Sequence, residues 1–175
     1  IPDKHRIIHE GDIVSLDAGV IYKGYHSDAA RTHAVGEVSE EAKKLIQVTK
    51  ECFFEGIKYA KAGNHLFDIS GAIGRYAEER GYGVVRDLCG HGIGTALHEA
   101  PEIPNYEVGR KGVKLRPGMT LAIEPMINIG TYEVDWLDDD WTVVTRDGSL
   151  SAHYENTILI TEGEPRILSL TCDNE

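Results

Sequence analysis

Three acidic residues lie in apolar surroundings where an ordinary surface acid is not expected. Asp17, Glu124 and Glu155 each lie in or beside an apolar run that is typical of a strand. A carboxylate placed there is costly unless it is paired or bound to a cation. If these acids converge with Asp28, two like charges about 4 Å apart repel each other by roughly 4 kcal/mol at an effective dielectric constant of about 20. Raised pKa values could relieve this repulsion, but two divalent cations balance four carboxylates, so the pattern favours a two-metal site.

His91 is the predicted fifth ligand of that site. It lies in the segment Gly90-His91-Gly92-Ile93-Gly94, and glycine lets the backbone approach a site closely and adopt unusual dihedral angles. A lone histidine is more often a structural residue, but the flanking glycines favour coordination here. His98 follows at a spacing that does not favour a second ligand on the same helix face, so we assign it to the substrate.

The elements that must position these residues follow from hydrophobic periodicity. From Ser39 to Gly63, apolar residues recur at three- and four-residue steps, which predicts an amphipathic helix that Ser39 caps and Gly63 ends. A second helix is predicted from Leu66 to Gly81. The segment 89–94 is predicted to be a loop and residues 138–140 a solvated hairpin tip. Runs of apolar and β-branched residues predict strands at residues 12–20, 25–35, 119–129, 141–145 and 153–160.

An internal similarity relates the two parts of the predicted site. Residues 11–17 and residues 118–124 both consist of a glycine, a strand-like run and a carboxylate. Each segment is followed by a second strand that bears an acid, Asp28 in one case and Glu155 in the other. Two such halves that meet at a pseudo-twofold axis would bring the four carboxylates together. Chance similarity between two strands is the alternative explanation.

Composition restricts the function classes. The length of 175 residues suits one domain, residues 1–175, and the net charge of −11 without a basic segment argues against nucleic acid as a partner. No apolar run reaches the roughly 20 residues that a membrane-spanning helix needs. Cys52, Cys89 and Cys172 show no metal-finger spacing. They are interpreted as reduced thiols of a cytoplasmic protein.

Three segments of the chain resemble the type I methionine aminopeptidases. Gly90–Gly94 followed by His98-Glu99-Ala100-Pro101 resembles the metal-binding loop of that family, and residues 117–125 and 147–157 resemble its two later ligand strands. The resemblance covers essentially the whole chain. It implies an α+β pita-bread fold with pseudo-twofold symmetry. The short interval between His91 and Glu124 argues against the type II enzymes, and the loop motif differs from those of aminopeptidase P and prolidase.

The resemblance also implies a role for each ligand. Asp17 would chelate one metal, His91 and Glu124 the other, and Asp28 and Glu155 would bridge both. A donor set of carboxylates with one imidazole suits manganese, iron or cobalt, with zinc as a further option.

The implied reaction is the removal of the N-terminal methionine from a peptide or nascent chain by a metal-bridging hydroxide. Glu124 would carry the proton, and His98 would hold the scissile amide and its developing charge. Trp141 and Leu97 match positions that line the substrate pocket.

The sequence departs from the family at its beginning. Type I members carry a His-Gly-Ile-Pro motif, whereas this sequence begins at Ile1-Pro2. We therefore expect an incomplete N-terminal half. We also expect self-association through the strand edge that it would expose.

Two other functions stay open at this point. One is a hydrolase of the same fold that acts on X-Pro peptides or a non-peptide amide. The other is a non-catalytic pita-bread module that binds peptides or partners. Loss of catalysis should be accompanied by loss of ligands, and all five predicted ligands are present.

Overall fold

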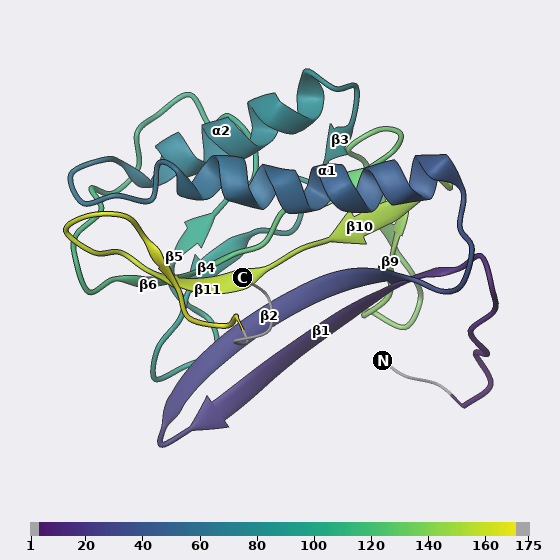
Figure 1. Ribbon diagram of the computed structural model, residues 1–175, viewed down its shortest axis with the longest axis horizontal. Helices are drawn as coiled ribbons and strands as arrows, with labels where there is room; N and C mark the ends of the chain where they lie inside the picture. The colour runs from purple at the N-terminus through teal and green to yellow at the C-terminus, as the bar shows by residue number, and fades with distance from the viewer. Residues whose placement is uncertain (1–3, 171–175) are drawn as a thin grey trace.

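The computed structural model describes residues 4–170, so the predictions that concern Ile1-Pro2 and Cys172 lie outside the described residues. Helices α1 (Glu40–Ile57) and α2 (Leu66–Glu78) pack against each other and form a layer over the strands (Figure 1). On the opposite side, β1 (Ile13–Tyr22) and β2 (Tyr25–Ala34) form a long antiparallel hairpin.

The remaining strands form three further sheets. The largest has the order β12-β11-β6-β4-β5, a second has the order β10-β7-β3, and β8 pairs with β9 in a hairpin. Their bounds are β3 Gly83–Val84, β4 Gly90–Gly92, β5 Glu99–Ile103, β6 Thr120–Ile123, β7 Met126–Asn128, β8 Val134–Trp136, β9 Val143–Thr145, β10 Ser151–His153, β11 Asn156–Leu159 and β12 Arg166–Ile167.

Both helices begin as predicted and end earlier than predicted. The Ser39 side chain accepts a hydrogen bond from the backbone N–H of Ala42 and so caps α1. The helix ends at Ile57 instead of Gly63, because the N–H groups that follow turn back to nearer carbonyls: that of Ala60 bonds to the carbonyl of Ile57. Gly63 has a φ of 94° and lies in the following turn. Similarly, α2 ends at Glu78, before Gly81.

Two predicted strands are each divided at an acidic residue. Residues 119–129 form β6 and β7, which belong to different sheets and are separated by Glu124 and Pro125. Proline has no N–H to donate to a ladder, which favours a break there. Residues 153–160 contain the last residue of β10 and all of β11, separated by Tyr154 and Glu155. The backbone N–H of Tyr154 bonds to the carbonyl of Pro125, so the two breaks lie next to each other.

The glycine-rich segment predicted as a loop contains a central strand. β4 lies between β6 and β5 in the five-stranded sheet. A Cβ atom on Gly90 would collide with the carbonyl oxygen of Ala122, and one on Gly92 would collide with that of Ala100. The glycines therefore allow the backbones to pack closely around His91. Sequence periodicity alone does not distinguish such a strand from a glycine-rich loop.

The main core lies between the helices and the sheets, and a smaller apolar cluster is formed by Val85, Met126 and Val134. The apolar face of α1, with Leu45 and Phe53 fully buried, packs against α2 and the inner strands. Cys52 belongs to this core and is a free thiol, as is Cys89, which agrees with the predicted reduced state of these two residues. None of the described helices has the length and apolar content needed to cross a membrane.

Candidate metal centre

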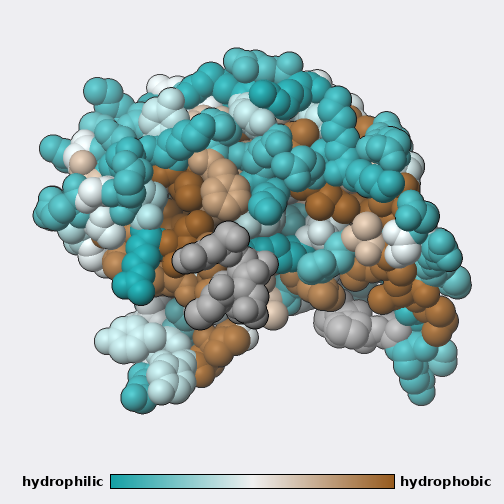
Figure 2. Space-filling view, in the orientation of Figure 1, coloured by the Kyte–Doolittle hydropathy of each residue, from teal (hydrophilic) through white to brown (hydrophobic). Residues whose placement is uncertain are grey.

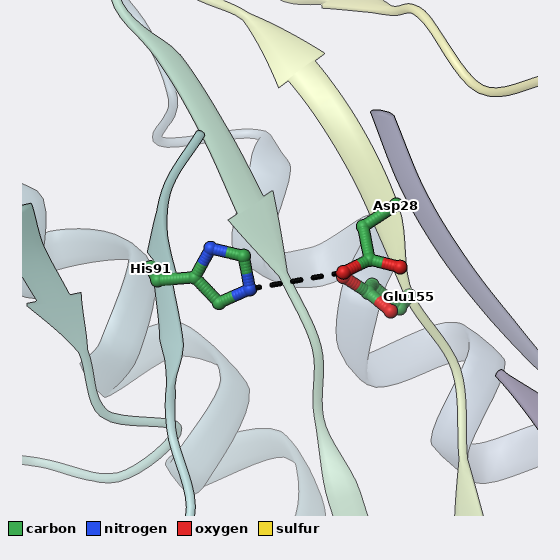
Figure 3. Close-up of side chains that lie close together, drawn as sticks. All are labelled: Asp28, His91 and Glu155. Carbon is green, nitrogen blue, oxygen red and sulfur yellow. Dashed lines mark ion pairs between the residues drawn. The ribbon is translucent and has the colours of Figure 1, made fainter. Parts of the chain in front are cut away.

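Asp28, His91 and Glu155 meet in the interior, where one ligand atom from each lies within 4.8 Å of the others. All three residues are buried. Figure 3 shows the imidazole of His91, carried by β4, pointing toward the two carboxylates, which approach from β2 and from the start of β11. Residues that are remote in the sequence thus converge because strands from three parts of the chain end or cross at this point.

The position of Asp28 is fixed by its neighbour on β11. The hydroxyl of Thr157 accepts a hydrogen bond from the backbone N–H of Asp28 at 2.8 Å and donates one to the backbone carbonyl of Asp28 at 3.0 Å. This double contact joins the hairpin to the five-stranded sheet. The backbone of Asp28 is therefore held in place, while its Oδ1 atom accepts a hydrogen bond from the N–H of Ala29 and its Oδ2 atom faces His91.

Glu155 is the most deeply buried acid of the group, with 1% of its surface exposed. Its Oε1 atom has no hydrogen-bond partner among the described residues. Burial raises its pKa to about 10, and the negative charges of Glu124, Asp28 and Asp17 add to this effect. An unpartnered buried carboxyl oxygen is unfavourable, so a bound cation would stabilise Glu155.

Arg31 is a cation that lies against the backbone of Glu155. Its guanidinium donates to the backbone carbonyl of Glu155 and to Oδ1 of Asn156, and it lies 4.0 Å from the ring centre of Tyr154. The positive charge of Arg31 opposes the rise in the pKa of Glu155, but its effect is smaller than that of burial. Arg31 thus positions the β10–β11 junction without neutralising the carboxylate.

His91 is oriented so that one ring nitrogen faces the acids. Its Nδ1 atom lies 2.9 Å from the carbonyl oxygen of Gly92, which requires Nδ1 to carry the proton. The other nitrogen, Nε2, lies 3.5 Å from Oε1 of Glu124 and 4.0 Å from Oδ2 of Asp28. A backbone carbonyl that fixes the tautomer in this way is the usual support of a histidine that binds a metal.

Asp17 joins the group from the side of the hairpin. On β1 its neighbour Gly19 pairs with Asp28. Partial burial of the Asp17 carboxyl raises its pKa, as do the charges of Asp28 and Glu124, while His153 lowers it. Asp17 as a whole is exposed, which differs from the enclosed position expected from its apolar sequence neighbours, because β1 pairs only with β2 among the described residues.

The three predicted substrate residues have different positions. The ring of His98 contacts that of His91 edge to face, with ring centres 4.4 Å apart. Leu97 and Asp28 both lie next to Gly19, because a Cβ atom built on Gly19 would lie 3.4 Å from Cδ1 of Leu97 and 3.7 Å from Oδ1 of Asp28. Trp141 is 65% exposed and follows the turn of the β8–β9 hairpin. Asp138–Asp140 form that turn, as predicted.

Sequence reasoning assigned no role to several residues that support the site. Arg31 and Thr157 hold the strands that carry Asp28 and Glu155, and Nε2 of His153 lies 3.6 Å from Oε2 of Glu124. His153 had a usable signal, because it is a histidine close to Glu155 in a strand-like run. Arg31 and Thr157 had none, since their importance depends on which strands are neighbours in space.

The donor set fits divalent cations. It combines carboxylate oxygens with one imidazole nitrogen, a mixture that suits manganese, iron or cobalt better than a structural zinc site rich in thiolates. The unpartnered Oε1 of Glu155 and its raised pKa are both expected of a ligand that a cation would stabilise in its charged form. The fold and this donor set together define a protein with a buried site for divalent cations.

Comparison with known proteins gives the family. The model of metallopeptidase family M24 matches residues 1–162. A methionine aminopeptidase of Clostridium acetobutylicum is 61% identical over 170 residues, which is 97% of this chain and 68% of that relative. The chain therefore belongs to metallopeptidase family M24 and, within it, to the methionine aminopeptidases. Removal of the N-terminal methionine is the function of that group.

Solved structures agree with this placement. The methionine aminopeptidase of Thermotoga maritima superposes with a TM-score of 0.95 at 49% identity, covering 98% of this chain and 69% of that one. The Xaa-Pro dipeptidase of Bacillus anthracis has a TM-score of 0.76 at 30% identity and is covered to only 42%. The fold is thus the pita-bread fold common to both groups. The chain spans about two thirds of the length of its methionine aminopeptidase relatives.

Proposed function

We propose that this chain hydrolyses the first peptide bond of substrates that begin with methionine, with two divalent cations held by five side chains. The observation that supports this most directly is the buried meeting of Asp28, His91 and Glu155, in which a carboxyl oxygen lacks any partner among the described residues. The proposed ligands are Asp17, Asp28, His91, Glu124 and Glu155.

The proposed division of ligands is the one that the family resemblance implies. Asp28 and Glu155 would be shared by two ions, Asp17 would hold one of them, and His91 with Glu124 would hold the other. This is supported by the closeness of Asp28, His91 and Glu155 and by the interactions of Asp17 and Glu124 with this group. Manganese, iron or cobalt is the proposed metal. When bound, such ions activate water for nucleophilic attack and polarise a peptide carbonyl.

The remaining chemistry belongs to Glu124 and His98. Glu124 is less buried than Glu155, and it would accept the proton of the attacking water and deliver it to the leaving amine. His98 stands against His91 with its ring open to solvent. It would donate a hydrogen bond to the scissile amide as negative charge develops there. Leu97 and Trp141 are proposed to contact the methionine side chain.

Replacing His98 with alanine should lower the kcat for a methionyl peptide on the order of 10²-fold, the usual loss when a donor to a developing charge is removed. The number of bound metal ions should not change, because His98 is not a proposed ligand. His33→Ala on the exposed surface of β2 is the matched control. An unchanged kcat in His98→Ala would remove this histidine from the mechanism.

The proposed function is tested by a metal count paired with turnover. The purified chain, loaded with Mn²⁺ or Co²⁺, is assayed on Met-Ala, Ala-Pro and a non-peptide amide. Preferential cleavage of Met-Ala with two bound ions supports the proposal. Preference for Ala-Pro or the amide would indicate another hydrolase of the same fold. Bound metal without turnover of any substrate would indicate a binding module.

Two finer proposals concern partners and place of action. The natural substrate we propose is the N-terminus of a nascent polypeptide, with the cytoplasm as the place of reaction. A second copy of the chain is the proposed protein partner, because β1 pairs only with β2 among the described residues and several of its apolar side chains are exposed. Figure 2 shows brown, apolar residues beside paler, more polar ones at the lower left, where this hairpin projects.

Sedimentation velocity should therefore show concentration-dependent association of this chain. Leu16 and Val20 are 60% and 61% exposed on β1, and an exposed apolar strand with an unpaired edge favours pairing with another strand. The double variant Leu16→Lys and Val20→Lys should shift the protein to the monomer. Lys58→Glu, at the exposed C-cap of α1, serves as a control for a change of charge outside β1. A strict monomer at high wild-type concentration would contradict self-association.

A further inference from the structure

The carboxylate of Glu124 lies between two imidazoles. Its Oε1 atom is 3.5 Å from Nε2 of His91, and its Oε2 atom is 3.6 Å from Nε2 of His153. His91 is already assigned as a ligand, whereas His153 has no part in the proposed mechanism. The two histidines approach different oxygens of the same carboxylate. One oxygen can therefore accept a hydrogen bond from His153 while the other faces His91.

The backbone of His153 is fixed by two strands. It pairs with Met126 of β7, close after Glu124 in the chain. The hydroxyl of Thr32 on β2 accepts a hydrogen bond from the N–H of His153 at 2.8 Å and lies 3.0 Å from its carbonyl oxygen, to which it can donate. Thr32 also contacts the hydroxyl of Ser15 on β1 at 2.8 Å. The imidazole is therefore directed into the site by contacts that do not involve the imidazole itself.

The ring nitrogen that faces Glu124 is buried and lacks a hydrogen-bond partner among the described residues. A buried polar atom left without a partner costs about 1–3 kcal/mol. The nearby Oε2 of Glu124 is an acceptor, and its distance of 3.6 Å exceeds the usual hydrogen-bond range by a few tenths of an ångström. A small rotation of either side chain would form the bond and satisfy the imidazole.

We propose that His153 is a positioning residue that carries its proton on Nε2 and donates it in a hydrogen bond to Oε2 of Glu124. This bond would hold the carboxylate with Oε1 turned toward His91 and Asp28. The inference rests on the proposed function, in which Glu124 is both a metal ligand and the proton carrier. His153 itself contacts neither the substrate nor the metal in this arrangement.

The tautomer of His153 is the first test and needs neither metal nor turnover. Histidine labelled with ¹⁵N is observed by NMR in the metal-free protein, and the signals of His153 are assigned from their absence in His153→Gln. We expect Nε2 to carry a proton, with a signal that shifts in Glu124→Gln. A ring protonated on Nδ1 alone, or a signal insensitive to Glu124→Gln, would overturn the proposal.

Two substitutions provide the second test. His153→Leu removes the donor and should lower both kcat and Mn²⁺ affinity by roughly 10- to 100-fold, as loss of a residue that orients a ligand does, with the KM for Met-Ala changed less than twofold. His153→Gln keeps an N–H donor and should stay within about threefold of the wild type. His33→Leu is the matched control on the exposed part of β2.

The outcomes separate the two proposals. Normal kcat and Mn²⁺ affinity in His153→Leu, or a loss in His153→Gln as large as in His153→Leu, would refute the positioning role. If His153→Leu does not fold, the tautomer of His153 and the kinetics of His153→Gln decide whether His153 positions Glu124. A wild-type chain that cleaves no methionyl peptide would refute the proposed function, while the NMR result and the Mn²⁺ affinities would still report on the His153–Glu124 bond.

Discussion

Asp28→Asn is expected to lower the kcat/KM of the metal-loaded chain on a methionyl peptide by about 10³-fold or more. Asparagine preserves the size of the side chain and the two backbone contacts with Thr157, but it removes a charge from the centre of the proposed site. The several kcal/mol that a positioned cation contributes to a transition state correspond to about a tenfold change in rate for each 1.4 kcal/mol. Steady-state kinetics measure the loss of kcat/KM, and calorimetric titration measures the loss of Mn²⁺ affinity that should accompany it.

The control for Asp28→Asn makes the same chemical change far from the site. Asp138 lies in the exposed turn between β8 and β9, so Asp138→Asn should retain wild-type kinetics and metal content. The melting temperature of metal-free Asp28→Asn should not fall, because removal of one of several adjacent negative charges relieves repulsion. Full activity in Asp28→Asn would be incompatible with the bridging position proposed for this acid.

Glu155→Gln should stabilise the metal-free protein at pH 8 while it removes metal binding. In the folded, metal-free chain the pKa of Glu155 is raised to about 10 by burial, against an ordinary value of 4.5. Between these values the unfolded chain has lost the proton that the folded chain retains. The free energy of unfolding therefore falls as the pH rises, by at most about 1.4 kcal/mol per pH unit, and this contribution is greatest below pH 4.5. Glutamine is neutral throughout and avoids that loss.

Thermal unfolding at pH 5 and pH 8, with EDTA and with Mn²⁺, measures this effect. Metal-free Glu155→Gln should melt at least about 2 °C above metal-free wild type at pH 8, and the difference should shrink at pH 5. Mn²⁺ should raise the melting temperature of the wild type only, since a ligand stabilises the state that binds it. Glu162→Gln on the exposed surface is the control. Equal pH dependence in Glu155→Gln and the wild type would show that this carboxyl is ionised without metal.

Several elements of the fold could be predicted because local rules determine them. Ser39 begins α1 through an interaction with the next turn, and the β1–β2 hairpin follows from apolar and β-branched runs. The helix ends and the strand breaks could not be placed in this way. After Ile57 the chain turns back on itself and then bonds to a distant segment, through the N–H of Gly63 and the carbonyl of Leu115. The break at Pro125 likewise adjoins a distant segment, because the carbonyl of Pro125 accepts a hydrogen bond from the N–H of Tyr154.

The site was partly predictable for a related reason. Glu155 lies beside an apolar run in which burial of an unpaired carboxylate would cost free energy. An acid in such a position therefore predicts a site that binds a cation. The convergence of the predicted acids needed either the internal similarity between residues 11–17 and 118–124 or the resemblance to a family. Arg31 and Thr157 could not be predicted, because an arginine or a threonine in a strand is common and only the neighbouring strand gives it a role. The segment around His91 was predicted as a loop, and its place as the strand β4 between β6 and β5 depends in the same way on which strands are neighbours.

The positions of Glu124 and Glu155 at strand breaks have a consequence for how the metal-loaded protein unfolds. Each acid lies where the chain leaves one sheet and enters another. A cation bound to both would connect the three-stranded and five-stranded sheets by bonds that are independent of backbone pairing. Neither sheet could then separate from its neighbour without giving up a ligand, so in the loaded protein the opening of one layer is tied to the opening of the other.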